Sequence, residues 1–252
     1  MTAKDSMTTM SPQSGHFYAV GIGPGSPDLL TLRATRLVEQ CDTVISPQAQ
    51  GSAKSLALEA VRPFIDKQKI IVNNYPMERN GHKTRERWQL FAKDVVKRCA
   101  AGESVVQITL GDPLIFATSS YLLQSLTDLM PKANIHVVPG ISAFQTAASR
   151  FVETLTLQED RLTLMSATDL HAVENALAQC ETLVLYKAGG CIEALMELLR
   201  RHNLLDRARL VSCCEQGDNE LLVADLSCWQ IQPLNYMTTM IVKISNRSWQ
   251  EV

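Results

Sequence analysis

The sequence predicts an α/β protein with two α/β domains. Short runs of β-branched and aromatic residues alternate with longer amphipathic segments through the first half of the chain, which is typical of a parallel sheet with helices on its faces. A second series of strand and helix patterns follows a polar, irregular stretch at residues 153–160. We therefore predict a disordered tail over 1–15, an N-terminal domain with a mainly parallel sheet and a linking helix over 16–152, and a C-terminal domain with a mixed sheet over 153–252.

The elements of the N-terminal domain follow from apolar periodicity and from glycine. Leu29, Leu32 and Leu37 mark a helix that ends near Cys41, and Gly102 is the expected cap of a long helix. In chain order we expect a strand at 17–20, that first helix, a strand at 43–45, a polar loop at 46–52, a helix at 53–61, a strand at 69–73, a helix at about 84–101, a strand at 105–110, a helix at 119–129, a strand at 135–138 and a linking helix at 141–151.

The C-terminal domain shows the same two kinds of pattern, with antiparallel pairing expected near its end. We predict strands at 162–165, 182–186, 210–214, 221–224 and 239–244, and helices at 170–179 and 192–201.

Composition and charge narrow the possible functions. The 252 residues are 46% hydrophobic, and the formal net charge is −2. With a pI near 6.2, no global basic field favours nucleic acid or a membrane as partner, so an anionic substrate needs a local basic cluster. No apolar run approaches the roughly 20 residues that span a bilayer. The 7 cysteines lack a CxxC pairing and the 5 histidines are dispersed, so we expect reduced thiols in a cytoplasmic protein, without a metal site.

Three glycine turns follow predicted strands. They are Gly21-Ile22-Gly23-Pro24-Gly25, Gly111-Asp112-Pro113 and Pro139-Gly140-Ile141-Ser142. Because the carboxyl ends of parallel strands meet at one edge of a sheet, and open α/β sheets bind ligands there, the turns predict a small-molecule site. Taken alone, Gly111-Asp112-Pro113 is also compatible with an ordinary β-turn.

A dinucleotide-binding motif is the alternative for the first turn. Its spacing is G-x-G-x-G, and Pro24 removes an amide donor where a pyrophosphate would need one. Asp42 stands at about the distance of the ribose-binding acid, but it precedes its strand. A nicotinamide cofactor is therefore disfavoured.

Residues 79–87 form the densest basic segment of the chain. This segment contains Arg79, Lys83 and Arg85, and arginine is suited to paired contacts with carboxylates. The alternative is a solvated helix start in which neighbouring glutamates offset part of the charge. Met77 and Trp88 flank the segment and could line an apolar substrate surface, although single residues of this kind are more often core.

Taken together, these motifs resemble the tetrapyrrole methylases, which use S-adenosylmethionine (SAM). The resemblance runs from about Phe17 to the end of the chain and rests on V-G-I-G-P-G-S-P-D-L-L-T-L-R-A at 20–34, T-L-G-D-P at 109–113, V-P-G-I-S-A-F at 138–144, L-V-L-Y-K at 183–187 and T-T-M-I-V at 238–242. Tyr75-Pro76-Met77, Trp88, Ser119-Ser120-Tyr121-Leu122 and Lys187 are similar to the branch that methylates C-20 of precorrin-2 or cobalt-factor II in cobalamin biosynthesis. The segments at 116–118 and 151–157 depart from common family patterns.

The resemblance implies two α/β domains with a ligand cleft between them, SAM as cofactor, a tetrapyrrole as substrate and a homodimer. The cofactor contacts that it implies are Pro24, Leu110, Gly111, Asp112, Ile115, Phe116, Ser142, Ala143, Lys187 and Gly217. For Ile115 and Ala143 core packing is the alternative, and for Lys187 extension into solvent. The substrate contacts would be Met77, Arg79, Lys83 and Arg85, and no residue is identified as a catalytic base. Another tetrapyrrole methylase, such as a uroporphyrinogen III C-methyltransferase, and a non-catalytic SAM-binding protein remain open.

Overall fold

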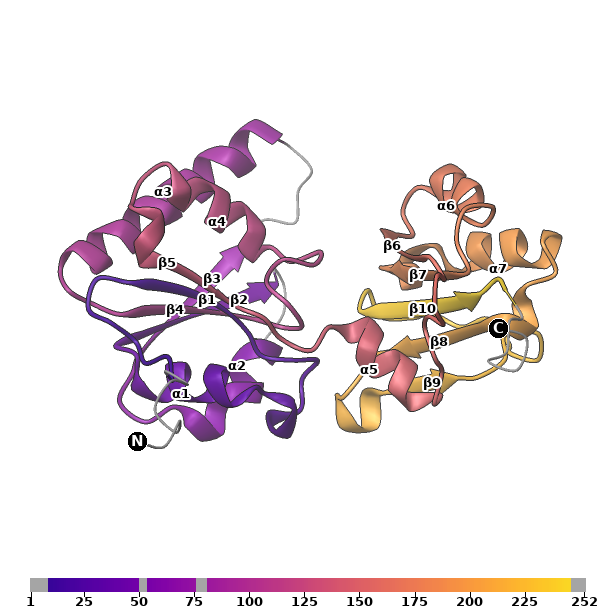
Figure 1. Cartoon of the computed structure of the whole chain (residues 1–252), viewed down its shortest axis with the longest axis horizontal. Helices are drawn as coiled ribbons and strands as arrows, with labels where there is room; N and C mark the ends of the chain where they lie inside the picture. Colours follow the sequence, from indigo (N-terminus) through magenta and orange to yellow (C-terminus); the bar gives the residue numbers. More distant parts are fainter. Residues whose placement is uncertain (1–8, 50–53, 76–80, 246–252) are drawn as a thin grey trace, which may run out of the picture. The chain divides into compact units, whose positions relative to one another are not determined.

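The computed structural model describes residues 9–49, 54–75 and 81–245, and the chain divides into two compact units (Figure 1). The units are Met1–Ser142 and Ala143–Val252. The predicted boundary after residue 152 is therefore wrong. The linking helix, α5 (Ala143–Arg150), belongs to the second unit because its Ala147 and Ala148 are buried against Val211 and Ile241 of the second sheet.

The prediction of a disordered tail over 1–15 is also wrong for the part of that segment that the structure describes. The backbone N–H of Gln13 donates to the Tyr18 hydroxyl at 2.9 Å, and Ser14 Oγ donates to the Gly102 carbonyl at 2.8 Å. These bonds fix residues 13 and 14 to the N-terminal unit. Residues 1–8 lie outside the described part of the chain.

A parallel five-stranded sheet forms the centre of the first unit, with strand order β3-β2-β4-β1-β5. Its strands are β1 (Phe17–Gly21), β2 (Thr43–Ala49), β3 (Lys69–Tyr75), β4 (Val105–Thr109) and β5 (Ile135–Val138). Its helices are α1 (Leu32–Gln40), α2 (Leu56–Val61), α3 (Gly81–Ala100) and α4 (Ser119–Thr127). The predicted alternation of strand and helix is confirmed.

Side-chain alternation along the strands builds one apolar core on each face of this sheet. In β1, Tyr18 and Val20 point to the face covered by α1 and α2, whereas Phe17 and Ala19 point to the face covered by α3 and α4 (Figure 1). All five residues of β1 are buried. The continuous apolar run at the start of this domain is thus explained by a central strand covered on both faces.

The predicted polar loop at 46–52 is wrong over its first part, because β2 continues to Ala49. The pairing of β2 with β4 ends at Ile45, whereas its pairing with β3 extends through Pro47 and on to Ala49. Proline lacks the N–H that a second neighbour would require, so it is tolerated where the strand has a neighbour on one side.

The second unit contains a mixed five-stranded sheet in the order β6-β7-β10-β8-β9. Its strands are β6 (Leu162–Ser166), β7 (Thr182–Tyr186), β8 (Ala208–Ser212), β9 (Leu221–Val223) and β10 (Thr238–Lys243), and its further helices are α6 (Leu170–Ala176) and α7 (Ile192–Arg201). Strands β6 and β7 are parallel, and the other pairs are antiparallel, as expected. Helices α6 and α7 cover one face, and α5 contributes to the core on the other.

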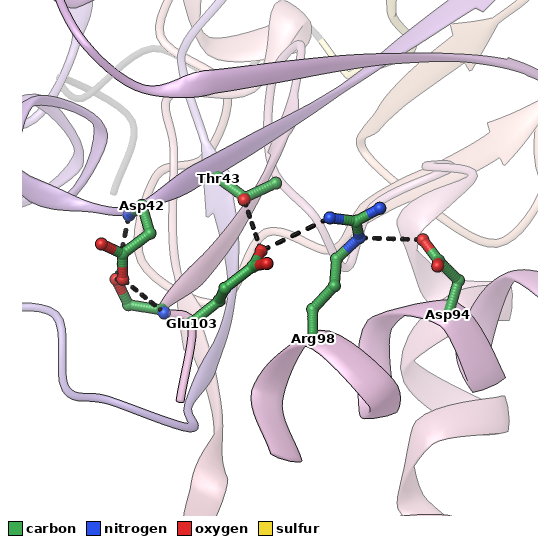
Figure 2. A network of polar contacts seen from close by, with 6 residues as sticks. Asp42, Thr43, Asp94, Arg98 and Glu103 are labelled. Carbon is green, nitrogen blue, oxygen red and sulfur yellow. Dashed lines mark hydrogen bonds and ion pairs between the residues drawn. The ribbon is translucent and has the colours of Figure 1, made fainter. Parts of the chain in front are cut away.

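Polar side chains hold the amino-terminal edge of the first sheet together (Figure 2). Asp42 Oδ2 accepts hydrogen bonds from the Ser104 amide at 2.8 Å and from Ser104 Oγ at 2.7 Å, which join the starts of β2 and β4. These bonds hold the pKa of Asp42 below its usual value. Thr43 Oγ1 donates to Glu103 at 2.7 Å, and Arg98 pairs with Asp94 at 2.9 Å. Asp42 is thus a structural residue at the edge opposite the glycine turns.

Candidate functional site

The first glycine turn follows β1, and the central one follows the adjacent strand β4. After these two strands the chain continues in opposite directions along the sheet. From β1 the chain passes through α1 to β2, and from β4 it passes through α4 to β5. Helices α1 and α4 pack on opposite faces of the sheet. The carboxyl ends of β1 and β4 therefore flank a topological switch point, which is where open α/β sheets form a ligand-binding crevice.

The three glycine turns lie at one edge of the sheet, as the sequence predicted, and hydrogen bonds join them. The Gly111 amide donates to the Gly23 carbonyl at 2.6 Å, and the Ile22 amide donates to the Thr109 carbonyl at 3.0 Å. The third turn is joined to the central one by the Gly140 amide, which donates to Asp112 Oδ2 at 3.1 Å. The turns therefore form one continuous backbone surface.

Close backbone approach explains why two of these positions are glycine. A Cβ at Gly21 would lie 2.6 Å from the Gly111 carbonyl oxygen and 2.6 Å from the Gly140 nitrogen. A Cβ at Gly140 would lie 2.7 Å from the backbone carbonyl carbon of Gly21. Backbone atoms cannot rotate away as a long side chain can, so any side chain at either position would force the turns apart.

Asp112 fixes the shape of the central turn and links it to the third. Its Oδ1 accepts from the Leu114 amide at 2.8 Å, and its Oδ2 accepts from Gly140. A carboxylate has about four acceptor positions, so Asp112 retains capacity for a ligand donor. Gly111 itself has φ +72, a conformation that favours glycine, and a Cβ there would meet only Ser142 Cα, at 3.9 Å.

An exposed apolar surface continues from the central turn into α4. Leu114, Phe116 and Tyr121 are 63%, 46% and 55% exposed. Ser119 Oγ donates to the Pro113 carbonyl at 2.8 Å, which fixes the start of α4 to the turn. The Tyr121 ring stacks on Trp88 of α3, with 5.8 Å between ring centroids.

The structure places the predicted substrate residues unevenly. Trp88 is buried in the core, which agrees with the alternative stated for it. Arg85 is exposed on α3, one turn before Trp88. Lys83 lies in α3, but its side chain is outside the described part of the structure, and Met77 and Arg79 lie outside the described residues altogether.

In the second unit, Lys187 and Gly217 lie at one edge of the sheet. Strands β7 and β8 are both antiparallel to β10, so their carboxyl ends lie at the same edge. Lys187 directly follows β7, and Gly217 lies in the loop after β8. Lys187 has φ 62, and its ammonium lies 5.7 Å from the centroid of the Tyr236 ring. This cation–π contact gives Lys187 a protein partner in place of simple extension into solvent.

The predicted cofactor residues thus fall into two groups, one in each unit. Ile115 and Ala143 are half-buried, which is compatible with both of the roles considered for them. Sequence reasoning missed Gly140, although the residue stood in a motif already identified, and it missed Tyr236, for which the sequence carried no signal. The first-unit group is Pro24, Leu110, Gly111, Asp112, Ile115, Phe116 and Ser142, and the second-unit group is Ala143, Lys187 and Gly217.

The described residues contain neither a metal-ligand cluster nor a helix that could span a membrane. Within 9–49, 54–75 and 81–245, no three histidine, cysteine, aspartate or glutamate side chains form a group that could hold a metal ion. Over the same ranges, no helix combines the length and apolar character needed to cross a membrane.

Comparisons with known proteins agree on one family. The family model of the Tetrapyrrole (Corrin/Porphyrin) Methylases matches residues 16–218. The chain is 31% identical to the cobalt-precorrin-2 C(20)-methyltransferase of Salmonella typhimurium over 246 residues, covering 94% of this chain and 98% of the relative. It is 26% identical to the probable cobalt-precorrin-2 C(20)-methyltransferase of Methanocaldococcus jannaschii, covering 90% and 95%.

A solved structure agrees on the fold. The uroporphyrin-III C-methyl transferase of Thermus thermophilus, complexed with S-adenosylhomocysteine, superposes with a TM-score of 0.61 at 22% identity, covering 90% of this chain and 96% of that one. The family model covers well over half of the chain, and the fold is the two-unit α/β fold that the motifs predicted. The chain therefore belongs to the tetrapyrrole (corrin/porphyrin) methylase family.

Proposed function

We propose that this protein is a SAM-dependent C-methyltransferase that methylates C-20 of precorrin-2 or cobalt-factor II in cobalamin biosynthesis. The observation that carries the proposal is the joined set of glycine turns at the switch point of a tetrapyrrole methylase fold. The choice of substrate is supported by two relatives, matched over nearly their whole length, that are named as cobalt-precorrin-2 C(20)-methyltransferases.

The residues at the carboxyl edge of the first sheet fit the polar parts of SAM. Ordinary van der Waals space lies above Gly111, so a ligand can approach the backbone there. Asp112 has acceptor capacity left after its two backbone bonds, which suits an amino group or a ribose hydroxyl. When bound, SAM supplies an electrophilic methyl group.

The chain need not supply a nucleophile for this reaction. The meso carbon at position 20 of a reduced tetrapyrrole is electron-rich and can attack the methyl group in line, so the main task of the protein is to position the two reactants and exclude water. We assign the positioning of SAM to Gly111 and Asp112 with their neighbouring turns, and the second-unit contacts to Lys187 and Gly217.

Substrate binding requires both an apolar surface and cations, because the substrate combines an apolar macrocycle with eight carboxylates. Exposed apolar area directly after the central turn is offered by Leu114, Phe116 and Tyr121. Arg85 is an exposed cation one turn from Trp88. We assign carboxylate binding to Arg85 together with Arg79 and Lys83, and an apolar contact with the substrate to Met77.

One incubation tests the proposal. The purified protein is mixed with SAM and enzymatically made precorrin-2, with and without cobalt, and the products are followed by mass spectrometry and absorbance. We expect one added methyl group. SAM binding without methylation of either tetrapyrrole would contradict the proposed reaction, and methylation of uroporphyrinogen III alone would assign the chain to another activity of the family.

We further propose that the protein is a cytoplasmic homodimer, as expected for this family. Light scattering during gel filtration should give a mass twice the 27.9 kDa of the chain.

A further inference from the structure

The loop that joins β8 to β9, residues 213–220, has an uncommon backbone conformation. Cys213, Glu215 and Gly217 have φ values of 52, 61 and 58. For the first two residues this left-handed conformation is unfavourable, because Cβ crowds the backbone. Such conformations persist where the surrounding structure holds them, and they concentrate at functional sites.

One arginine holds the loop at two points. Arg150, the last residue of α5, places Nη2 2.6 Å from Glu215 Oε1. Its Nε donates to Glu220 Oε1 at 3.2 Å, and its Nη2 donates to Glu220 Oε2 at 3.3 Å. The Glu215 amide donates to Glu220 Oε1 at 3.0 Å, so the loop is closed by a ring of bonds around one guanidinium.

The two carboxylates depend on Arg150 because they lie close together and are largely shielded from solvent. Their side chains are 14% and 16% exposed. Burial disfavours ionisation of Glu220, but the Glu215 amide and Arg150 outweigh it, so the pKa of Glu220 lies below its usual value. Without the guanidinium, the carboxylates of Glu215 and Glu220 would repel each other, and we expect the loop to open.

The same loop lies at the edge of the second sheet that carries Lys187. The Cys213 amide donates to the Met237 carbonyl at 3.0 Å, one residue from the Tyr236 ring that contacts Lys187. Gly217 is exposed, and its carbonyl accepts from the Glu220 amide at 2.9 Å within the loop. A Cβ at Gly217 would meet nothing within 4 Å.

We propose that Arg150 is a positioning residue for SAM, which fixes the β8–β9 loop so that the backbone at Gly217 is presented to the cofactor. The proposal rests on the proposed function, since it requires SAM to bind this edge. Arg150 acts through Glu215 and Glu220 and does not touch the cofactor. A preformed loop binds more tightly because less ordering is required on binding.

Another arginine of the same unit provides a matched control. Arg161 Nη2 lies 2.9 Å from Glu181 Oε1, and its Nε donates to Glu181 Oε2 at 3.1 Å. This pair joins residues that precede β6 and β7, at the opposite edge of the sheet. Arg161→Ala therefore removes a comparable ion pair without changing the loop.

The test measures S-adenosylhomocysteine binding by calorimetry, with thermal unfolding in parallel, for the full chain and its Arg150→Ala, Arg150→Lys, Glu215→Gln and Arg161→Ala variants. We expect at least a tenfold loss of affinity for Arg150→Ala, smaller losses for Arg150→Lys and Glu215→Gln, and affinity within twofold of the parent for Arg161→Ala. In steady-state kinetics of Arg150→Ala, KM for SAM should rise while KM for the tetrapyrrole is unchanged.

Three results would overturn the proposal. Parent-like affinity in both Glu215→Gln and Arg150→Lys would do so even if Arg150→Ala does not fold. An equal loss in Arg161→Ala would show that only stability had changed. If the parent protein binds S-adenosylhomocysteine and methylates normally, each of these two results contradicts the role of Arg150 and leaves the proposed function intact. The third result is a parent protein that binds no S-adenosylhomocysteine, which contradicts the proposed function as well.

Discussion

The two edges of the first sheet are held together by different chemistry. At the carboxyl edge, glycine backbones contact one another directly, and the Asp112 carboxylate links the central and third turns. At the amino edge, side chains form the links, from Asp42 and Ser104 to Thr43, Glu103 and Arg98 (Figure 2). The carboxyl edge also presents the exposed apolar side chains of Leu114 and Phe116.

This difference shows how one sheet separates stability from binding. At the amino edge, polar side chains bond one another and join the starts of β2 and β4, so they contribute to stability. At the carboxyl edge the turns are held by contacts that involve almost no side chains, so Leu114 and Phe116 remain exposed. The comparison predicts that changes at the amino edge affect stability alone, whereas changes at the carboxyl edge also affect binding.

The largest effect is expected at Gly21. Gly21→Ala places a methyl group against two backbone atoms at 2.6 Å, and overpacking of this kind costs about 3 kcal/mol. Urea denaturation measures the loss. The control is Gly190→Ala, where the added Cβ meets nothing within 4 Å. Equal stability of the two variants would contradict the close approach of the turns.

A smaller effect is expected at the amino edge. Asp42→Asn removes a charged acceptor that receives two bonds from Ser104, and its loss costs about 1 kcal/mol of unfolding free energy. In the folded state the hydrogen bonds from Ser104 hold the pKa of Asp42 below its usual value of 3.8. Its contribution to stability is therefore complete above that value and is lost as pH falls through the lower folded-state pKa.

The pH dependence provides the check on Asp42. The difference in unfolding free energy between the parent and Asp42→Asn should stay constant near neutral pH and shrink in strong acid. A difference that does not depend on pH would show that the carboxylate charge is not involved.

The smallest effect is expected from a histidine pair beside the amino edge. His16 Nδ1 lies 2.8 Å from His136 Nε2, and the His136 ring also stacks on Tyr18 at 4.7 Å. Burial and then His16 lower the pKa of His136 from 6.5. The unfolded chain therefore binds a proton at His136 more readily than the folded chain does. Protonation of His136 leaves the free energy of unfolding unchanged above pH 6.5 and lowers it below that pH, by less than about 1 kcal/mol.

His136→Gln tests this expectation, because glutamine does not titrate. Its unfolding free energy should decline less steeply than that of the parent as the pH falls below 6.5. Identical slopes would exclude a contribution from His136.

The sequence predicted the first domain well because its signals are local. Glycine turns follow buried strands, and this pattern indicates both the parallel sheet and the edge where its turns meet. It could not place the domain boundary, since the small residues of α5 are compatible with either unit, and only tertiary packing assigns Ala147 to the second core. The ring around Arg150 was also inaccessible, because its partners Glu215 and Glu220 lie 65 and 70 positions away in the chain.

The most direct test compares two carboxylates that each accept two backbone or side-chain bonds at opposite edges of the same sheet, Asp42 and Asp112. Calorimetry measures the affinity of Asp42→Asn and Asp112→Asn for S-adenosylhomocysteine under conditions in which both variants are folded. We expect an affinity within twofold of the parent for Asp42→Asn and at least a tenfold loss for Asp112→Asn. Full affinity in Asp112→Asn, or an equal loss in both variants, would contradict the assignment of the cofactor to the carboxyl edge.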